Sequence, residues 1–329
     1  MADQLRREDY TVGWVCALPI ELAAAQEMLD EEHSRPRYDT YDTNVYTYGR
    51  VGEHNVVIAC LPAGQTGTNS AAAVAVRMKS TFASMRLGLM VGIGGGVPSK
   101  KADVRLGDVV VSMPHKTHGG VVQYDFGKAI LNRFERTGAL NTPPQVLLEA
   151  VQELRAKHIR GKGRFSECLS KLDRLPKFAR EAAGPDALYN ATYDHKEGAT
   201  CEQCEASFLV AREPRGQDVM VHYGTIASGN QVIRSAAERD RVSAELGGVL
   251  CFEMEAAGLM NSFPCLVIRG ICDYADSHKN KKWQAYAAAT AAACAKDVML
   301  VIPPVEVLDP LLNHKVIADQ RHGEDMPHL

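Results

Sequence analysis

Short runs of branched apolar residues alternate with helical segments along most of this chain, and that alternation limits the fold more than any other feature. Residues 10–18 form the first such run, and a helix opened by a proline is expected over 19–31. Proline suits a first helical position because its missing N–H would have no partner there. Residues 55–61 and 87–93 are further apolar runs, separated by an Ala-rich helical stretch at 67–84. This order predicts an α/β fold with a largely buried sheet.

The same pattern predicts further elements toward both ends of the chain. The strand at 87–93 is expected to stop at the glycine triplet 94–96. From 128 to 218 the periodicity weakens, and 303–329 is polar and contains prolines, as in a tail or linker. The remaining expected elements are strands at 44–50, 108–112, 219–228 and 266–272, and helices at 143–158, from about 231, and at 283–301.

The bulk composition excludes several classes of protein. The chain has 329 residues, a formal net charge of −3 and nine cysteines. That charge gives no reason to expect nucleic acid or a membrane surface as a partner, and no run reaches the roughly 18 apolar residues of a membrane span. The N-terminus lacks the apolar stretch of a signal peptide. An odd number of scattered cysteines is typical of a reducing compartment, so we expect a soluble cytoplasmic protein.

Two apolar segments in the C-terminal third carry acidic residues. Residues 251–258 contain Glu253 and Glu255, and residues 267–274 contain Asp273. A carboxylate is costly to bury unless it accepts hydrogen bonds. Three of them at the edge of a core therefore predict a pocket that handles hydroxyl groups and protons.

Several turns that follow strands are candidate binding loops. Glu21 lies just after the first strand, where ligands bind in open α/β sheets, although a glutamate there also suits the helix dipole. The turns at 64–70, 91–97 and 224–232 are rich in glycine or hydroxyl residues, which leave backbone N–H groups free for a ligand. Residues 64–70 lack the P-loop ending, and 91–97 lack the dinucleotide spacing. Each turn taken alone fits a purely structural role as well.

A Cys-x-x-Cys pair, Cys201 and Cys204, follows His195 at a spacing like that of metal ligands. No second Cys-x-x-Cys supplies a fourth ligand. A structural pair is the interpretation that the sequence favours over a metal site, and we predict no bound metal.

Six of these segments follow one another in an order that is far more specific than any one of them. They are residues 17–21, 92–96, 106–112, 226–230, 252–255 and 269–273. In this order they resemble the nucleoside phosphorylase and nucleosidase superfamily, which includes purine nucleoside phosphorylase and methylthioadenosine/S-adenosylhomocysteine nucleosidase. The amino-acid sequences of residues 121–126 and 272–277 are most similar to the nucleosidase-type domain of fungal proteins. In those proteins this domain often precedes NACHT or ankyrin regions. The resemblance implies a three-layer α-β-α fold with a central mixed, partly barrel-like sheet, over residues 1–302.

The resemblance also implies cleavage of a purine N-glycosidic bond, in which a ribosyl cation forms as the base departs. Asp273 matches the acid that protonates the purine, a role that suits a partly desolvated carboxyl group. Glu21 matches the carboxylate that activates water, so that two carboxylates flank the scissile bond. Glu255 matches the residue that binds the ribose 2′- and 3′-hydroxyls, with Glu253 as its support. The other expected substrate contacts are Met254 under the sugar, Gln231 and Val232 at the purine, and Thr66, Gly94, Gly95 and Asn230 in the turns.

Water is favoured over phosphate as the nucleophile. Phosphorylases of this superfamily hold phosphate with arginines and a Ser or Thr near the glycine turns, because the dianion needs charge-assisted donors. Here Met90 stands two residues before Gly92 and Ile93 directly after it, although Arg77, Arg86 or an arginine of a neighbouring subunit remain possible donors. We therefore predict a purine nucleosidase, with a phosphate-dependent phosphorylase and a non-catalytic nucleoside sensor as alternatives.

The resemblance further bears on the 5′ side of the substrate and on assembly. Asp125, Phe126 and Trp283 are expected at the 5′ side because they lie near matched motifs in the sequence. Residues 128–218 depart from the family pattern and are expected to form a lid, an oligomer contact or a specificity element. A homo-oligomer, with a dimer favoured, and the absence of a cofactor complete the expectation.

Overall fold

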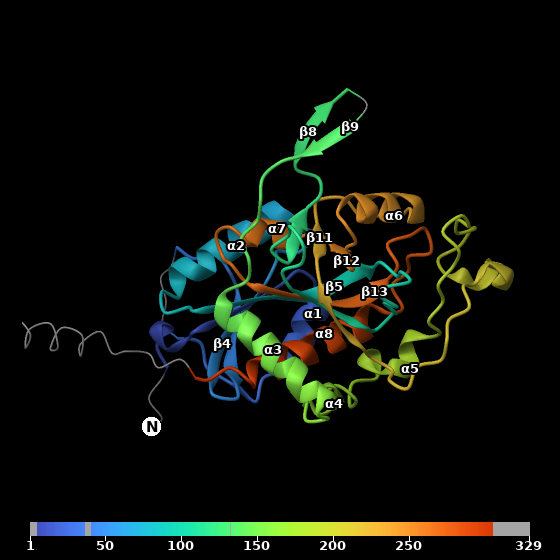
Figure 1. The fold of residues 1–329 in the computed structure, drawn as a ribbon. Coiled ribbons are helices and arrows are strands. Elements are labelled where there is room, and N and C mark those ends of the chain that lie inside the picture. The colour runs from blue at the N-terminus through green and yellow to red at the C-terminus, as the bar shows by residue number, and fades with distance from the viewer. Residues whose placement is uncertain (1–4, 37–40, 132, 305–329) are drawn as a thin grey trace, which may run out of the picture.

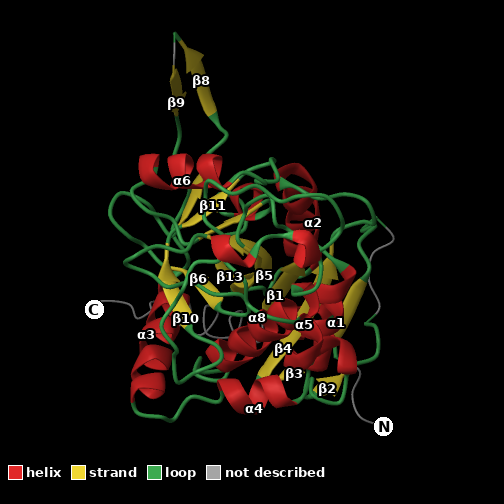
Figure 2. Cartoon of the chain, turned by 90° about the vertical axis from the view of Figure 1, so that its right-hand side faces the viewer, coloured by secondary structure: helices red, strands yellow, loops and turns green. Residues whose placement is uncertain are grey.

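A branched, mixed β-sheet of 11 strands forms the centre of the computed structural model, which describes residues 5–36, 41–131 and 133–304. A short branch leaves the sheet at β5 and consists of β12 (Cys251–Glu253), β11 (Ile226–Ser228) and β7 (Val121–Gln123). The main path runs, in spatial order, through β10 (Val221–Gly224), β6 (Val109–Ser112), β13 (Leu266–Asp273), β5 (Leu87–Gly96), β1 (Val12–Cys16), β4 (His54–Cys60), β3 (Tyr46–Val51) and β2 (Glu31–Glu32), all of which are labelled in Figure 2 (Figure 1 gives the overall view).

Parallel pairing dominates the middle of the sheet, and antiparallel pairing appears toward its edges. Strand β1 is parallel to both β4 and β5, and β13 is parallel to β5. Strand β6 is antiparallel to β13, and β3 is antiparallel to β4. All residues of β1 and β13 are buried, as expected for strands that are covered on both faces. The α/β fold with a mixed sheet is thus confirmed, and the sheet remains open instead of closing into a barrel.

Helices cover the sheet on both faces and complete three layers. One face carries α1 (Pro19–Glu27) and α8 (Gln284–Met299), and the other carries α2 (Thr68–Thr81) and α7 (Ala256–Leu259) (Figures 1 and 2). The alanines of α8 let it approach β13 closely: a Cβ atom on Gly270 would overlap the carbonyl of Ala287. Helix α6 (Ala236–Glu245) lies beside the short branch of the sheet, where its Val242 joins a small apolar cluster.

The segment 128–218 adds helices to the core and a hairpin outside it. Strands β8 (Gly127–Ile130) and β9 (Arg133–Arg136) pair with each other and project from the body of the molecule (Figures 1 and 2). Helices α3 (Gln145–Ile159) and α4 (Phe165–Ser170) pack on the face of α8, and their buried Leu147, Leu154 and Cys168 belong to the main hydrophobic core. The remaining elements are α5 (Arg180–Ala183) and the single 3-10 turns η1 (Arg7–Asp9), η2 (Pro176–Phe178), η3 (Cys201–Gln203) and η4 (Ala206–Phe208).

Several predicted boundaries are wrong, and the strand expected over 219–228 is divided into β10 and β11. Strand β5 continues through the glycine triplet, because Gly95 and Gly96 pair with Phe252 and Cys251 of β12. That pairing outweighs the preference of consecutive glycines for a turn. Helix α1 ends at Glu27 instead of 31, and α6 begins at Ala236 instead of about 231, after Ser235 caps its N-terminus by accepting the N–H of Glu238.

Two further expectations concern membrane-spanning helices and the C-terminal tail. Of the helices that the structure describes, none combines the length and the apolar character needed to cross a bilayer. The predicted tail, 303–329, lies outside the described residues from position 305 onward.

Candidate active site

A cavity of about 270 Å³ opens at the carboxyl ends of β1, β5 and β13 and beside β12. This is the edge at which open α/β sheets bind their ligands. Lys279 also faces the cavity, although the sequence analysis gave it no role. The predicted residues that line the cavity are Glu21, Thr66, Gly94, Gly95, Gln231, Val232, Glu253, Met254, Glu255 and Asp273.

Glu21 reaches the cavity from the first turn of α1 and is 4% exposed. Its Oε2 accepts the backbone N–H groups of Ala17 (2.7 Å) and Leu18 (2.9 Å), and its Oε1 accepts that of Ile93 (2.8 Å). Burial raises the pKa of Glu21 above its ordinary value, although Arg269 and these N–H groups act in the opposite direction. The carboxyl group is therefore held in one orientation and is a better proton acceptor than an exposed glutamate.

Gly92 makes room for this arrangement in the middle of β5. A Cβ atom at this position would overlap both the Glu21 carboxylate and the guanidinium of Arg269. The glycine therefore serves a close approach of two charged side chains to the strand backbone, and not a turn.

Arg269 is a wholly buried cation on β13 that joins two of the predicted carboxylates. Its Nη2 donates to Oε2 of Glu253 in a very close contact and lies 3.4 Å from Oε2 of Glu255. Burial alone would lower the pKa of Arg269, but Glu253, Glu255 and Glu21 together raise it above its ordinary value. The arginine is charged and compensates part of the negative charge behind the cavity.

Glu253 and Glu255 have different surroundings. Glu253 accepts the backbone N–H groups of Glu255 (3.1 Å) and Ala256 (3.0 Å), so it caps the start of α7. Oε1 of Glu255 accepts the N–H of Gly67 (3.2 Å), in the turn before α2. Burial, opposed by Arg269 and reinforced by the neighbouring carboxylates, raises the pKa of Glu255 to about 7.

Asp273 ends β13 and is 5% exposed. Its Oδ1 accepts the N–H of Ala275 (2.9 Å), and its Oδ2 lies 3.1 Å from Nζ of Lys279. Although burial lowers the pKa of Lys279, the Asp273 carboxylate raises it above its ordinary value. Gly95 leaves space for this carboxyl group, since a Cβ atom there would come within 2.8 Å of Oδ1. The pair places one carboxyl group and one ammonium donor at the same wall of the cavity.

Four predicted contacts do not line this cavity. The side chain of Asn230 turns toward α2, where its Oδ1 accepts the N–H (3.0 Å) and Oγ1–H (3.1 Å) of Thr68. Asp125 accepts the N–H of Asn230 (2.6 Å) and so secures the loop that carries Gln231. Phe126 is 57% exposed at the foot of the β8–β9 hairpin. Trp283 lines a neighbouring cavity of about 360 Å³, held by the donation of its Nε1–H to the Pro185 carbonyl (3.3 Å) and by Arg180 over its ring.

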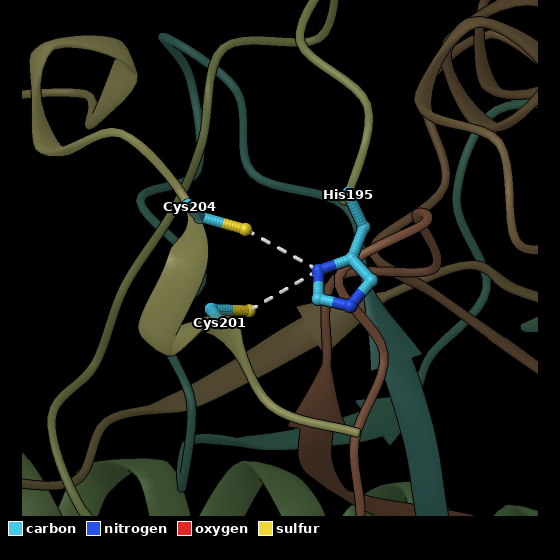
Figure 3. Close-up of side chains that lie close together, drawn as sticks. All are labelled: His195, Cys201 and Cys204. Carbon is cyan, nitrogen blue, oxygen red and sulfur yellow. Dashed lines mark hydrogen bonds between the residues drawn. The ribbon is translucent and has the colours of Figure 1, made fainter. Parts of the chain in front are cut away.

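His195, Cys201 and Cys204 come together outside the cavity, and they are the residues that could hold a metal ion among those that the structure describes (Figure 3). The sequence motifs assigned no role to Arg269 or Lys279. Arg269 had a signal, because it is the one basic residue in a strand that is apolar up to its last residue, Asp273. Lys279 had no such signal in the sequence, because only the folded loop brings its ammonium group to Asp273.

The comparisons with known proteins agree with this architecture. The family model described as "Phosphorylase superfamily" matches residues 11–301. A nucleotide-binding leucine-rich repeat (NLR)-like protein of Hyaloscypha variabilis is 48% identical over 95% of this chain, which spans only 31% of the length of that relative. The 5′-methylthioadenosine/S-adenosylhomocysteine nucleosidase of Mycobacterium bovis is 26% identical, over 89% of this chain and 97% of its own length.

A solved structure shares the fold at low sequence identity. The futalosine hydrolase of Helicobacter pylori is 17% identical and superposes with a TM-score of 0.56, over 88% of this chain and 97% of its own. The family match covers nearly all of the sheet and of the cavity described above. The chain therefore belongs to the phosphorylase superfamily.

Proposed function

We propose that this protein is a purine nucleoside N-ribosyl hydrolase. The observation that carries the proposal is the convergence of Glu21, Glu255 and Asp273, from three separate segments, on one cavity. In this reaction Asp273 donates a proton to the departing purine, Glu21 takes a proton from the attacking water, and Glu255 binds the ribose hydroxyls. The family to which the chain belongs includes nucleosidases, which supports N-glycosidic cleavage.

The charge around the cavity suits a transition state in which the sugar is positive. Three buried carboxylates, Glu21, Glu253 and Glu255, stand against the single guanidinium of Arg269. When Glu21 and Glu255 are deprotonated, the excess of negative charge in this desolvated site stabilises a cation that forms there. Glu255 and Glu21 are therefore placed to favour the ribosyl cation over the neutral nucleoside.

The purine has proposed partners on two opposite walls of the cavity. Asp273 and Lys279 offer a proton and a hydrogen-bond donor to the purine. Gln231 and Val232 supply the opposite wall, and Tyr124 fixes their loop by donating its O–H to the Gln231 carbonyl (2.8 Å). A flat base between these walls would present its N7 edge to Asp273.

Water is the nucleophile that the lining residues favour. Among the described residues that line the cavity, Lys279 is the only cation, and it is paired with Asp273. Arg77 and Arg86 are exposed and lie outside the lining. A phosphate dianion needs charge-assisted donors, whereas a water molecule needs only an acceptor such as Glu21.

Product analysis tests the proposal. The purified protein is incubated with inosine, adenosine and guanosine, with and without inorganic phosphate, and the products are separated by chromatography. Free base and ribose should form in phosphate-free buffer. Products that appear only with phosphate would establish the phosphorylase alternative, and binding without turnover of any nucleoside would establish the sensor alternative.

A further inference from the structure

His195, Cys201 and Cys204 present three ligand atoms to one point in space (Figure 3). The Nδ1 atom of His195 lies 3.3 Å from Sγ of Cys204 and 3.9 Å from Sγ of Cys201, and all three atoms lie within 4.8 Å of one another. In a tetrahedral zinc site with Zn–S of about 2.3 Å and Zn–N of about 2.1 Å, neighbouring ligand atoms are roughly 3.5–3.8 Å apart. The three atoms thus stand near the spacing that one zinc ion requires.

The imidazole of His195 is already oriented as a metal ligand. Its other ring nitrogen, Nε2, lies 3.0 Å from the carbonyl oxygen of Gly198. Because a carbonyl only accepts hydrogen bonds, Nε2 carries the proton and Nδ1 turns its lone pair toward the two sulfur atoms. A hydrogen bond from the second nitrogen to a backbone carbonyl is the usual support of a zinc-bound histidine.

The donor set determines which metal fits. Two thiolates and one neutral imidazole select Zn²⁺ over Mg²⁺ and Ca²⁺, which prefer oxygen ligands. Two thiolate charges also balance the charge of Zn²⁺, so the site needs no further ionised partner. All three side chains are half-buried, which leaves access for the metal and for a solvent oxygen as fourth ligand.

We propose that His195, Cys201 and Cys204 form a zinc site. Binding releases the two thiol protons to solvent and forms one Zn–N and two Zn–S bonds, with no change of oxidation state. From the sequence alone a structural role was favoured for Cys201 and Cys204, because no fourth protein ligand follows them at a recognisable spacing. The folded geometry supplies what the spacing did not, namely the orientation of His195.

The site fastens the segment that follows α5 to the loop that follows β13. The backbone N–H of His195 donates to Oγ of Ser277 (2.9 Å), and Sγ of Cys201 lies 3.8 Å from the carbonyl of His278. The ring of Tyr189 stacks on that of His278 with 4.2 Å between centroids. Lys279, the partner of Asp273, is the next residue. Zinc would therefore order the segment 195–204, whose His195 N–H contacts the loop that carries Lys279.

Metal content tests this proposal independently of nucleoside turnover. The full chain is saturated with Zn²⁺, dialysed, and analysed by elemental mass spectrometry. About one zinc per chain is expected, and Cys201→Ser, Cys204→Ser and His195→Gln should each reduce it at least tenfold. Cys60→Ser, at a half-buried cysteine of β4, and His115→Gln, at an exposed histidine, are matched controls that should retain zinc.

A metal-binding test on the unaltered protein, by absorption spectroscopy with Co²⁺, does not depend on whether the variants fold. Co²⁺ added in place of Zn²⁺ should give the intense thiolate-to-cobalt absorption of tetrahedral sulfur ligation, and Zn²⁺ should displace it. Chelation of the zinc should also lower the melting temperature. A chain without stoichiometric zinc and without the cobalt band, or equal zinc in the ligand variants and the controls, would overturn the proposal. A Cys201–Cys204 disulfide persisting in reductant would do so as well.

Discussion

Nη2 of Arg269 lies 3.4 Å from Oε2 of Glu255, inside a sheet that leaves the arginine 1% exposed. The same guanidinium also contacts Glu253. One buried cation therefore organises two carboxylates that approach from β12 and from the start of α7. This contact couples the stability of the fold to the charge of the candidate active site.

Removing that cation should be costly. Arg269→Met leaves the carboxylates without their partner, and breaking a buried ion pair on one side typically costs about 3–5 kcal/mol. Arg241→Met is the control, because Arg241 forms exposed ion pairs with Glu238 and Glu245 on α6 and should change stability by less than about 1 kcal/mol. Urea denaturation measures both. Equal, small effects in the two variants would mean that the buried pair contributes nothing specific.

Asp273→Asn should cut turnover and leave the fold intact. The amide keeps the size of the side chain but cannot donate the proton that the purine needs. General acid catalysis typically contributes about 10²–10⁴-fold, so kcat should fall within that range while the protein still folds and unfolds in one cooperative transition. Asp240→Asn, at an acidic residue on α6 that pairs with Arg239, serves as the control. Turnover near that of the unaltered protein in Asp273→Asn would exclude the acid role.

Glu21 should set the acidic limb of the pH profile. A general base works only when deprotonated, and burial raises the pKa of Glu21 above its ordinary value. Activity should therefore fall as the pH drops through that raised pKa. Glu21→Gln should lose about 10²–10⁴-fold in rate and should abolish this limb. Initial rates of base release across the pH range measure both effects, and an unchanged acidic limb in the variant would assign it to another group.

Glu255 should make stability depend on pH. Burial is the main cause that raises the pKa of Glu255 from 4.5 to about 7 in the folded protein. A raised pKa means that its contribution to folding is fully present below about 4.5 and is lost as the pH rises through about 7. Relative to Glu255→Gln, the unaltered protein should lose up to about 3 kcal/mol of unfolding free energy between these limits. Denaturation of both proteins at pH values below 4.5 and above 7 tests this, and parallel curves would contradict it.

The sequence predicted the carboxylates of the site better than it predicted their partners. Asp273 ends a strand, and Glu21 and Glu255 follow shortly after strands, in an ordered series of motifs; strand ends meet at one edge of an α/β sheet. Phe126 and Trp283 were assigned by nearness in sequence alone, but a projecting hairpin and a neighbouring cavity take them elsewhere.

The errors and omissions share a physical cause. The partners of Arg269 and Lys279, like the antiparallel pairing of Gly95 with β12, depend on contacts between distant segments. Local propensity favours a turn at consecutive glycines and gives no sign of such contacts. The expected homo-oligomer, with a dimer favoured, stays a prediction that the molecular mass in solution would test.

The central claim is that water, activated by Glu21, attacks the ribosyl carbon. It is tested most directly by turnover of inosine in water enriched in heavy oxygen, with phosphate present, followed by mass spectrometry of the sugar. We expect ribose that carries one heavy oxygen atom, formed at the same rate with or without phosphate, and formed much more slowly by Glu21→Gln. Ribose 1-phosphate as the product would contradict it.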